Sequence, residues 1–371
     1  MKFSTTKTDL QNALQKLSKI IPNRTTIPIL GNVLITSESG SINMRATDLE
    51  QTLTLTTPAS IEEEGSAVIP VEPLLNITNE LPDSRITLSI DKNHNITLKS
   101  DTGEYVLKGM EQGEFPAPPE INKEKPVTLS SKLLKSIIKV ASFAISRDEL
   151  KPSLTGVLMQ FEQKSLTVVS TDGHRLVRYK VNNFNSGGFS GNIIIPKKFL
   201  NLAQNLLGQT DSIEIQIGKN NITASFGSDT VCSRVIDEQY PDYESVIPKN
   251  NDKTLQANNQ DLISAVKRVS IFSNRTTQQI SIKIDKGKIE IGTEDPEKAT
   301  KALEKLRAEY EGDPITIGYN ALYLKELLSI MPSKKITIKL NTPISASVFY
   351  PGEKEKDTEI TMLLMPIRLN D

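Results

Sequence analysis

Cysteine, histidine and tryptophan are nearly absent from this chain, and each scarcity excludes a class of site. Cys232 is the only cysteine among 371 residues, so no disulfide can form within one chain. There are two histidines, no tryptophan, and neither a C-x-x-C nor an H-E-x-x-H pattern. The usual spacings of metal ligands therefore cannot be assembled, and we expect neither a bound metal nor another cofactor.

Long apolar runs and glycine-rich phosphate loops are missing too. No apolar segment approaches bilayer-spanning length, and the N-terminal "MKFSTTKTDL" lacks the apolar stretch of a signal peptide. We therefore expect a cytoplasmic protein with no membrane partner. No Gly-rich loop precedes a predicted helix, which argues against a nucleotide site. With 37% hydrophobic and 24% charged residues, the composition is typical of a globular protein of two or three domains.

An excess of positive charge is also lacking. Lysine and arginine number 44 against 45 aspartates and glutamates, which gives a formal net charge of −1. A protein that binds nucleic acid purely by neutralising phosphates is usually strongly basic. If this chain meets DNA or RNA, its basic residues must therefore be segregated onto one surface.

Three copies of one pattern run through the sequence. An aromatic or apolar residue precedes proline in "GEFPAPP", "EQYPDYE" and "LLMPIRL", at Pro116, Pro241 and Pro366. The spacing is constant, since 241 − 116 and 366 − 241 both equal 125. In the same phase, "MRATDLE", "VVSTDGH" and "IGTEDPE" each place threonine and an acidic residue at the end of a strand-like segment. Such a period in independent markers indicates repeated domains.

Each repeat reads as two amphipathic helices, each followed by several short strands with polar turns. Ser, Thr and Asn occupy plausible cap positions where "TTKTDLQNALQKL", "LSSKLLKSIIKVA" and "ANNQDLISAVKRV" begin their helices. Segments rich in Pro, Lys and Asn, "APPEINKEKP" and "IPKNNDKT", follow the first two prolines and read as linkers. We predict an α+β protein of three tandem domains with antiparallel sheets, spanning residues 1–120, 127–247 and 252–371.

One predicted helix, residues 131–144, carries a stripe of lysines. Leu133, Ile137, Val140, Ala141 and Ala144 share one face at helical spacing, and the opposite face carries Lys132, Lys135 and Lys139. Lys16 and Lys19 lie similarly on the first helix, and Arg268 on the helix near 259–271. A solvated face is the common explanation of such a stripe, but solvated faces usually interleave glutamate with lysine. These helices are poor in glutamate, which favours a weakly positive surface for DNA.

The stretch "STDGHRLVRYK" resembles catalytic equipment because Asp172, His174 and Arg175 are adjacent. A hydrolase would need a nucleophile or a second titrating partner. The equivalent stretches "ATDLE" and "GTEDP" keep the acid without a histidine, so we expect Asp172 to cap a turn around Gly173. His174 and Arg175 then occur in only one of the three repeats. This is expected of a binding site that is added to one copy of a repeated scaffold. A hydrolase, a core histidine and a three-domain scaffold that binds no nucleic acid stay open as alternatives.

Four separated motifs resemble one known family. "STDGHRL", "RTTIPILGN", "YPDYESVIP" and "MPIRL" are similar, in order and from end to end, to the bacterial DNA polymerase III β subunit, the sliding clamp. The resemblance implies a non-catalytic processivity factor: a head-to-tail homodimeric ring of six domains, with helices lining a hole through which duplex DNA passes unread. It implies four kinds of partner: double-stranded DNA, a clamp loader, the replicative polymerase, and other proteins that dock through short peptides.

The family's peptide-binding pocket carries over onto matching positions, with His174 and Arg175 at its polar rim. The implied pocket residues are Leu154, Thr171, Gly173, His174, Arg175, Leu176, Pro241, Val246, Leu363, Leu364, Met365, Pro366, Ile367 and Arg368.

The family's DNA-facing surface and subunit interface also carry over. The expected DNA-facing residues are Arg24, Lys132, Lys135, Lys139, Lys197 and Lys198, and the expected interface residues are Tyr105, Leu107, Ile271 and Phe272. Two departures from relatives lie near the pocket: a C-terminal extension, Asn370 and Asp371, and Ser245 in place of a basic residue. Both affect which peptides we expect the pocket to prefer.

Overall fold

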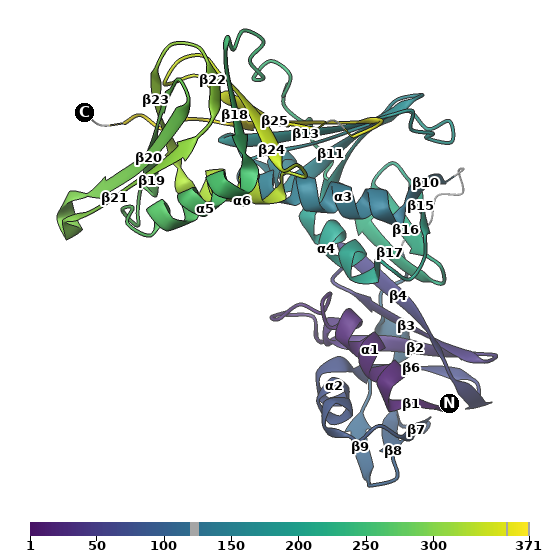
Figure 1. Ribbon diagram of the computed structural model, residues 1–371. Helices are drawn as coiled ribbons and strands as arrows, with labels where there is room; N and C mark the ends of the chain where they lie inside the picture. Colours follow the sequence, from purple (N-terminus) through teal and green to yellow (C-terminus); the bar gives the residue numbers. More distant parts are fainter. Residues whose placement is uncertain (119–125, 354, 370–371) are drawn as a thin grey trace. The chain divides into compact units, whose positions relative to one another are not determined.

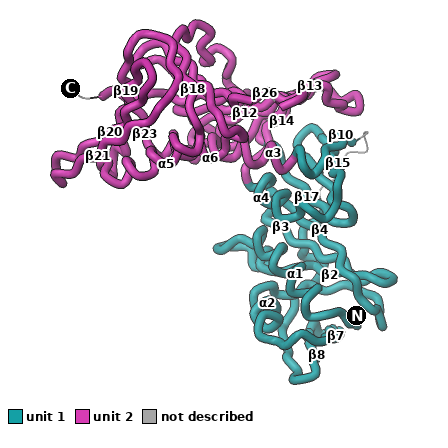
Figure 2. Tube along the Cα trace, viewed as in Figure 1, with its two compact units in different colours: residues 1–133, 198–235 teal, residues 134–197, 236–371 magenta. Residues whose placement is uncertain are grey.

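The computed structural model describes residues 1–118, 126–353 and 355–369 (Figure 1). The chain forms two compact units (Figure 2): unit 1 contains residues 1–133 and 198–235, and unit 2 contains residues 134–197 and 236–371. The middle predicted repeat therefore contributes to both units. The tail Asn370–Asp371 and most of the first predicted linker lie outside the described residues.

Unit 1 contains two antiparallel sheets. Strand β17 of the middle repeat pairs with β4 of the first, with Val231 opposite Leu53. This pairing makes one sheet out of strands from two repeats. The five-stranded sheet has the order β5 (Ser60–Glu63), β1 (Lys2–Thr6), β7 (Arg85–Ile90), β8 (Asn95–Lys99), β9 (Glu104–Lys108). The eight-stranded sheet has the order β10 (Val127–Ser130), β15 (Ser212–Ile217), β16 (Asn221–Phe226), β17 (Asp229–Arg234), β4 (Gln51–Pro58), β3 (Ser41–Thr47), β2 (Asn32–Glu38), β6 (Gly65–Pro70).

Unit 2 repeats this arrangement with the other half of the middle repeat. Strand β13 pairs with β26 of the third repeat, in a register that places Leu176 opposite Leu363. The nine-stranded sheet has the order β14 (Gly191–Pro196), β11 (Gly156–Phe161), β12 (Ser165–Thr171), β13 (Arg175–Asn182), β26 (Thr358–Leu364), β25 (Ser347–Pro351), β24 (Lys335–Leu340), β18 (Lys253–Asn258), β22 (Glu309–Glu311). The four-stranded sheet has the order β21 (Thr300–Arg307), β20 (Lys288–Asp295), β19 (Gln279–Asp285), β23 (Ile315–Asn320).

The described residues contain six α-helices, two for each predicted repeat, so the α+β prediction with paired helices is confirmed. The helices are α1 (Lys7–Leu17), α2 (Val71–Glu80), α3 (Ser131–Ala141), α4 (Lys197–Leu206), α5 (Asn259–Ser270) and α6 (Ala321–Ile330). Short 3₁₀ turns occupy Pro28–Gly31, Gln112–Glu114, Ser142–Ala144, Pro152–Thr155 and Pro296–Lys298.

Polar caps and apolar stripes explain why these helices begin and pack where they do. The Thr6 hydroxyl accepts a hydrogen bond from the Asp9 N–H, and Asn258 caps α5 in the same way. Helix α1 packs against α2, and α5 packs against α6. Each buried leucine or isoleucine on these faces contributes about 1.5–3 kcal/mol.

Helix α3 corrects part of the predicted apolar face. The helix ends at Ala141, and Leu133 is only half-buried, whereas Leu134 and Ile138 join Ile137 in the core. Leu133 and Leu134 are neighbours on the helix, at 3.6 residues per turn, and both lie near the edge of the apolar face. Helical spacing alone therefore does not predict which of the two is buried. No helix in the described part of the chain is long and apolar enough to cross a bilayer.

Candidate functional site

The hairpin between β12 and β13 is built by the Asp172 carboxylate. Its Oδ1 accepts hydrogen bonds from the N–H groups of His174 at 2.9 Å and Arg175 at 3.0 Å. Gly173 has φ of +88°, a conformation that glycine adopts without strain. Because both lone-pair regions of Oδ1 are engaged in the turn, the structural role expected for Asp172 is confirmed.

Arg175 is held on several sides by its own chain. Its Nε donates to Asp172 Oδ2 at 2.9 Å, and its Nη1 pairs with Glu326 of α6. The guanidinium carbon lies 4.4 Å from the centroid of the Tyr323 ring and 5.2 Å from that of Phe143. Only 11% of the side chain is exposed. A guanidinium that stacks on aromatic rings and pairs with two separate carboxylates anchors the elements that carry them, here the hairpin and α6.

His174 lies at the surface beside this anchor. Its side chain is exposed, its ring centroid is 6.0 Å from that of Tyr323, and its carbonyl accepts the N–H of Met365 at 2.7 Å. The alternative of a buried core histidine is therefore wrong. An exposed imidazole can donate a hydrogen bond to a ligand or accept one from it.

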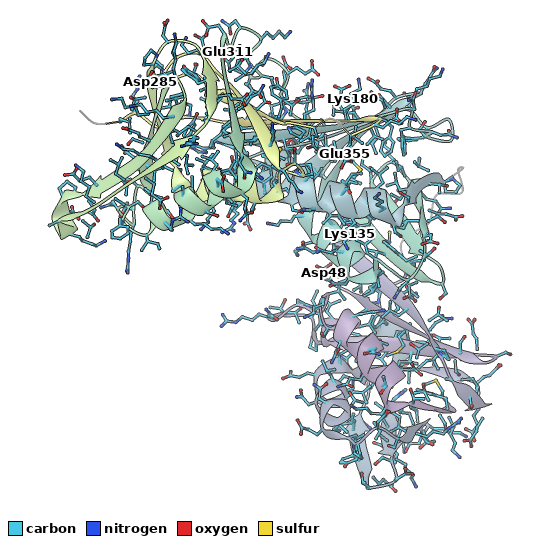
Figure 3. The ribbon with its side chains drawn as sticks, in the orientation of Figure 1. Asp48, Lys135, Lys180, Asp285, Glu311 and Glu355 are labelled. Atoms are coloured by element: carbon cyan, nitrogen blue, oxygen red, sulfur yellow. The ribbon has the colours of Figure 1, made fainter. Side chains whose placement is uncertain are left out.

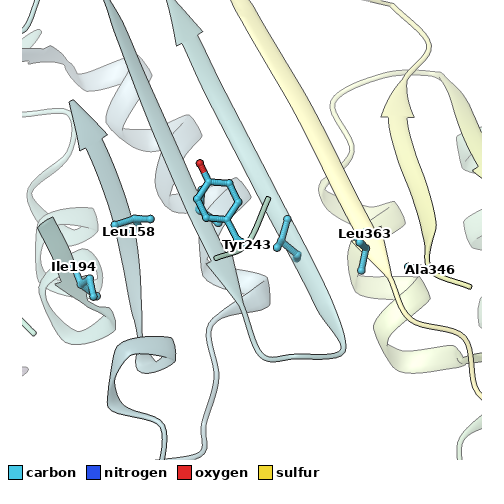
Figure 4. Packing of buried hydrophobic residues seen from close by; sticks show 7 residues of the cluster. Leu158, Ile194, Tyr243, Ala346 and Leu363 are labelled. Carbon is cyan, nitrogen blue, oxygen red and sulfur yellow. The ribbon is translucent and has the colours of Figure 1, made fainter. Parts of the chain in front are cut away.

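An apolar cluster of unit 2 includes Leu176, the residue that directly follows Arg175 (Figure 4). Leu176 and Leu363, both expected pocket residues, face each other across β13 and β26 and belong to it. Ile236, Tyr240 and Ile247 pack against it from the segment after β17. The buried members are Leu158, Val169, Leu176, Ile194, Tyr243, Ala346 and Leu363.

Exposed apolar side chains lie close in the sequence to members of this cluster or to residues that pack on it. Val246 is 55% exposed and Met365 is 40% exposed, and Ile344 reaches 63%. The N–H of Ile367 donates to the Gly318 carbonyl at 2.9 Å, which fixes the C-terminal segment on β23. A Cβ at Gly318 would lie 2.5 Å from the Ile367 carbonyl oxygen, so glycine is required there. The other expected pocket residues divide into buried Leu154 and Leu364, half-buried Thr171 and Pro366, and exposed Pro241 and Arg368.

Unit 2 therefore brings the expected pocket residues of two repeats onto one sheet and its adjoining loops. Sequence reasoning missed Tyr323, Tyr243 and Ala346, which contact this site or its apolar cluster. No local signal marks them, because Tyr323 lies 149 residues after His174 in the chain. An apolar floor with exposed polar and apolar edges can bind the side chains and backbone of an extended peptide.

The predicted lysine stripe on α3 is exposed. Lys132, Lys135 and Lys139 have no ion-pair partner within the described ranges (Lys135 is labelled in Figure 3). Lys198 pairs with Asp48 at 3.4 Å, whereas Arg24 is exposed and Lys197 is half-buried. Arg268 differs, because both nitrogens of its fork donate to the Glu304 carboxylate at 2.6 Å. Arg268 is thus engaged within the chain.

Two outer strands carry exposed apolar residues at their sheet edges. Strand β9 ends the five-stranded sheet and exposes 65% of Val106, and β21 ends the four-stranded sheet and exposes 56% of Leu303. Of the expected interface residues, Ile271 is 76% and Phe272 42% exposed, while Tyr105 and Leu107 are half-buried. Unpaired strand edges of this kind are templates for pairing with another chain.

Comparison with known proteins decides what this architecture is. Family models for the N-terminal, central and C-terminal domains of the DNA polymerase III β subunit match residues 1–119, 128–242 and 244–368. The chain belongs to the DNA polymerase III β-subunit family.

Relatives of this β-subunit family match over the whole chain. The β sliding clamp of Pseudomonas putida is 28% identical, with full coverage of both chains. The solved sliding clamp of Bartonella birtlesii, bound to griselimycin, is 30% identical with a TM-score of 0.94, again with full coverage. The Bacillus subtilis clamp has 25% identity, a TM-score of 0.94 and full coverage. The three-domain clamp fold implied by the sequence motifs is confirmed.

The hydrolase alternative finds no support in this β subunit. Of the three residues that the alternative would use, Asp172 is committed to the hairpin turn and to Arg175, and Arg175 is stacked on Tyr323. The β-subunit family is a non-catalytic processivity factor. The cluster that resembled catalytic equipment is therefore a structural turn with one exposed histidine.

Proposed function

We propose that this protein is a sliding clamp that encircles duplex DNA and tethers the replicative polymerase and other DNA-processing proteins. The main support for this proposal is the match over the whole chain, in three consecutive domains, to relatives named as β sliding clamps. The proposed domain bounds are 1–120, 127–247 and 252–371. We also propose that it acts in the cytoplasm, where its DNA partner is.

The proposed DNA-facing residues are Arg24, Lys132, Lys135, Lys139, Lys197 and Lys198. The exposed lysines of α3 support this surface, since they carry charge that no acid of the described chain neutralises. A net charge of −1 is compatible with a clamp. When retention is topological, weak phosphate contacts suffice, and strong release of counterions would hinder sliding.

Two chains would complete the ring through a head-to-tail contact. The apolar edges of β9 and β21, with Ile271 and Phe272, support this joint. A heterologous contact closes into a ring when its rotation permits, and otherwise forms filaments. Because each chain supplies three domains, a six-domain ring is a homodimer. A closed ring requires a separate loader to open it onto DNA.

Partner proteins would dock as short peptides on the groove around His174. Support comes from the apolar cluster, the exposed Met365 and the exposed Val246. Methionine is adaptable and suits a surface that accepts several partners. The Bartonella relative was solved with griselimycin. We therefore expect this protein to bind griselimycin, and we propose the groove as its site.

The decisive experiment loads the protein onto nicked circular DNA and then linearises the circle. A topologically linked clamp stays bound to the circle and is released on linearisation, while Ile271→Asp with Phe272→Asp should not be retained at all. Retention that survives linearisation would mean ordinary DNA binding, and no retention by the wild type would favour the scaffold alternative.

A second measurement tests the groove. Griselimycin affinity should fall about tenfold in His174→Ala, as expected for loss of one contact worth about 1.4 kcal/mol. The matched control is His94→Ala, which removes the other histidine, an exposed residue of unit 1. Equal affinity in both variants would place the ligand elsewhere.

A further inference from the structure

A cavity lies beside the apolar cluster in unit 2. Its volume is about 320 Å³. Ile247 lines the cavity and also packs on the cluster. Arg178, another lining residue, is two positions after Leu176 on β13, so both side chains lie on the same face of the sheet. The cavity therefore adjoins the apolar cluster that forms the floor of the proposed peptide groove.

Positive charge dominates this cavity. Arg178, Lys249 and Lys339 line it, and Glu244 is the one acidic residue among the described residues of its lining. Arg178 Nη1 lies 3.6 Å from Glu244, whose side chain is 61% exposed. Neither lysine has an ion-pair partner anywhere in the described chain. Three cations against one carboxylate leave an excess positive charge that an anion would neutralise.

Two further lining residues offer hydrogen bonds. The Asn251 Nδ2 donates to the carbonyls of Lys339 at 2.9 Å and Ala346 at 3.1 Å, which fixes the amide. Its Oδ1 is buried and has no hydrogen-bond partner among the described residues. Burial raises the pKa of Tyr350, although Arg178 partly opposes this, so the hydroxyl is a donor at neutral pH.

We propose that this cavity binds the carboxylate of an aspartate or glutamate in a partner peptide whose apolar side chains occupy the groove. The cations of the cavity would pair with this carboxylate. This inference rests on the proposed function of the groove. The proposal adds a requirement for the partner peptide that the apolar floor alone does not impose. The peptide must carry an acidic residue at a fixed distance from its apolar residues.

The spacing of that acid follows from strand geometry. Leu176 and Arg178 are two residues apart, or about 6.6 Å along a strand. An extended peptide also advances about 3.3 Å per residue, so the acid should lie about two residues from the apolar side chain over Leu176. In the free protein Glu244 occupies the place of that carboxylate. Its exposure and its 3.6 Å contact make it easy to displace.

The test compares synthetic extended peptides that share one apolar core and carry either Glu or Gln placed one, two or three residues beyond each end. Binding to the full-length protein is measured by fluorescence anisotropy at low and at high salt. At one position Glu should bind about tenfold more tightly than Gln, the value for one charge-assisted hydrogen bond worth about 1.4 kcal/mol. High salt should reduce this preference.

Three variants locate the preference. Lys249→Ala and Lys339→Ala change exposed side chains, so the fold should persist and the Glu preference should fall. Glu244→Gln should increase it, because the internal competitor is removed. Lys283→Ala is the matched control, an exposed lysine of the same unit outside the cavity. It should leave the preference unchanged.

The failure modes are distinct. If Gln and Glu peptides bind equally well at every position, this inference is overturned while the groove function stands. If no peptide binds, the groove function fails and this inference fails with it. If inorganic phosphate binds the cavity and the two peptides bind equally, the cavity belongs to a free anion and the peptide assignment is wrong.

Discussion

The guanidinium carbon of Arg175 lies 4.4 Å from the centroid of the Tyr323 ring. Through this contact the β12–β13 hairpin of the middle repeat is stacked on helix α6 of the third. The same guanidinium pairs with Asp172 and Glu326. Arg175 thus joins two elements that are far apart in the chain, beside the exposed ring of His174.

Replacing Arg175 should therefore cost stability. We expect Arg175→Ala to lower the free energy of unfolding by about 2–3 kcal/mol, because Asp172 and Glu326 lose their partner and the stacking on Tyr323 is lost. Arg175→Lys should recover only part, since lysine lacks the planar fork. His174→Ala, at an exposed position, should stay within about 0.5 kcal/mol of wild type. Urea unfolding measures all three, and equal stability of the two alanine variants would contradict the anchoring role.

Charging a free sheet edge should break the dimer. Val106→Glu would place a carboxylate in each joint of the proposed ring without a partner, which is costly in an apolar contact. Sedimentation should show wild type near twice 41.0 kDa and the variant near 41.0 kDa. Leu150→Glu is the control, because Leu150 is 90% exposed but lies on neither β9 nor β21. A wild type that sediments as a monomer at micromolar concentration would contradict the ring.

Reversing the lysine stripe should impair DNA retention and spare the fold. Lys132, Lys135 and Lys139 are exposed, so changing all three to Glu should shift the free energy of unfolding by less than about 1 kcal/mol. Loading on DNA and processivity should fall alike on all sequences, with the larger loss at low salt. Griselimycin affinity should not change.

A matched triple variant separates this surface effect from net charge. Lys92, Lys219 and Lys286 are exposed lysines in hairpin turns, and changing them to Glu alters the net charge equally. This control should retain DNA like the wild type. An equal loss in both variants would show that overall charge, and not the surface of α3, governs retention.

The Arg268–Glu304 pair should make stability depend on acid pH. Hydrogen bonding to Arg268 holds the pKa of Glu304 below its usual range. A lowered folded-state pKa contributes stability above the unfolded carboxyl's pKa, and this is lost as pH falls through the folded value. Glu304→Gln should therefore lower Tm slightly at pH 7, and the difference from wild type should shrink as the pH falls through the folded-state pKa of Glu304. Glu311→Gln, at an exposed position with no ion pair in the described chain, should show no such trend.

Sequence alone determined the repeats, the paired helices and the family. These features are local: a cap such as Asn258 and the 3.6-residue spacing of α5 act within a few residues. The turn role of Asp172 was also readable, because its hydrogen bonds reach only two and three residues ahead. The sequence did not predict that Leu134 is buried and Leu133 only half-buried, because this depends on what helix α3 packs against.

Tertiary structure decided how the repeats combine and what surrounds the site. The middle repeat is divided between two units because its β17 pairs with β4 and its β13 pairs with β26. Arg175 stacks on Tyr323, and Arg178 and Lys339 line the same cavity, across separations of about 150 and about 160 residues. Strand pairing between repeats sets these contacts, and a local pattern carries no information about which distant edge a strand will join.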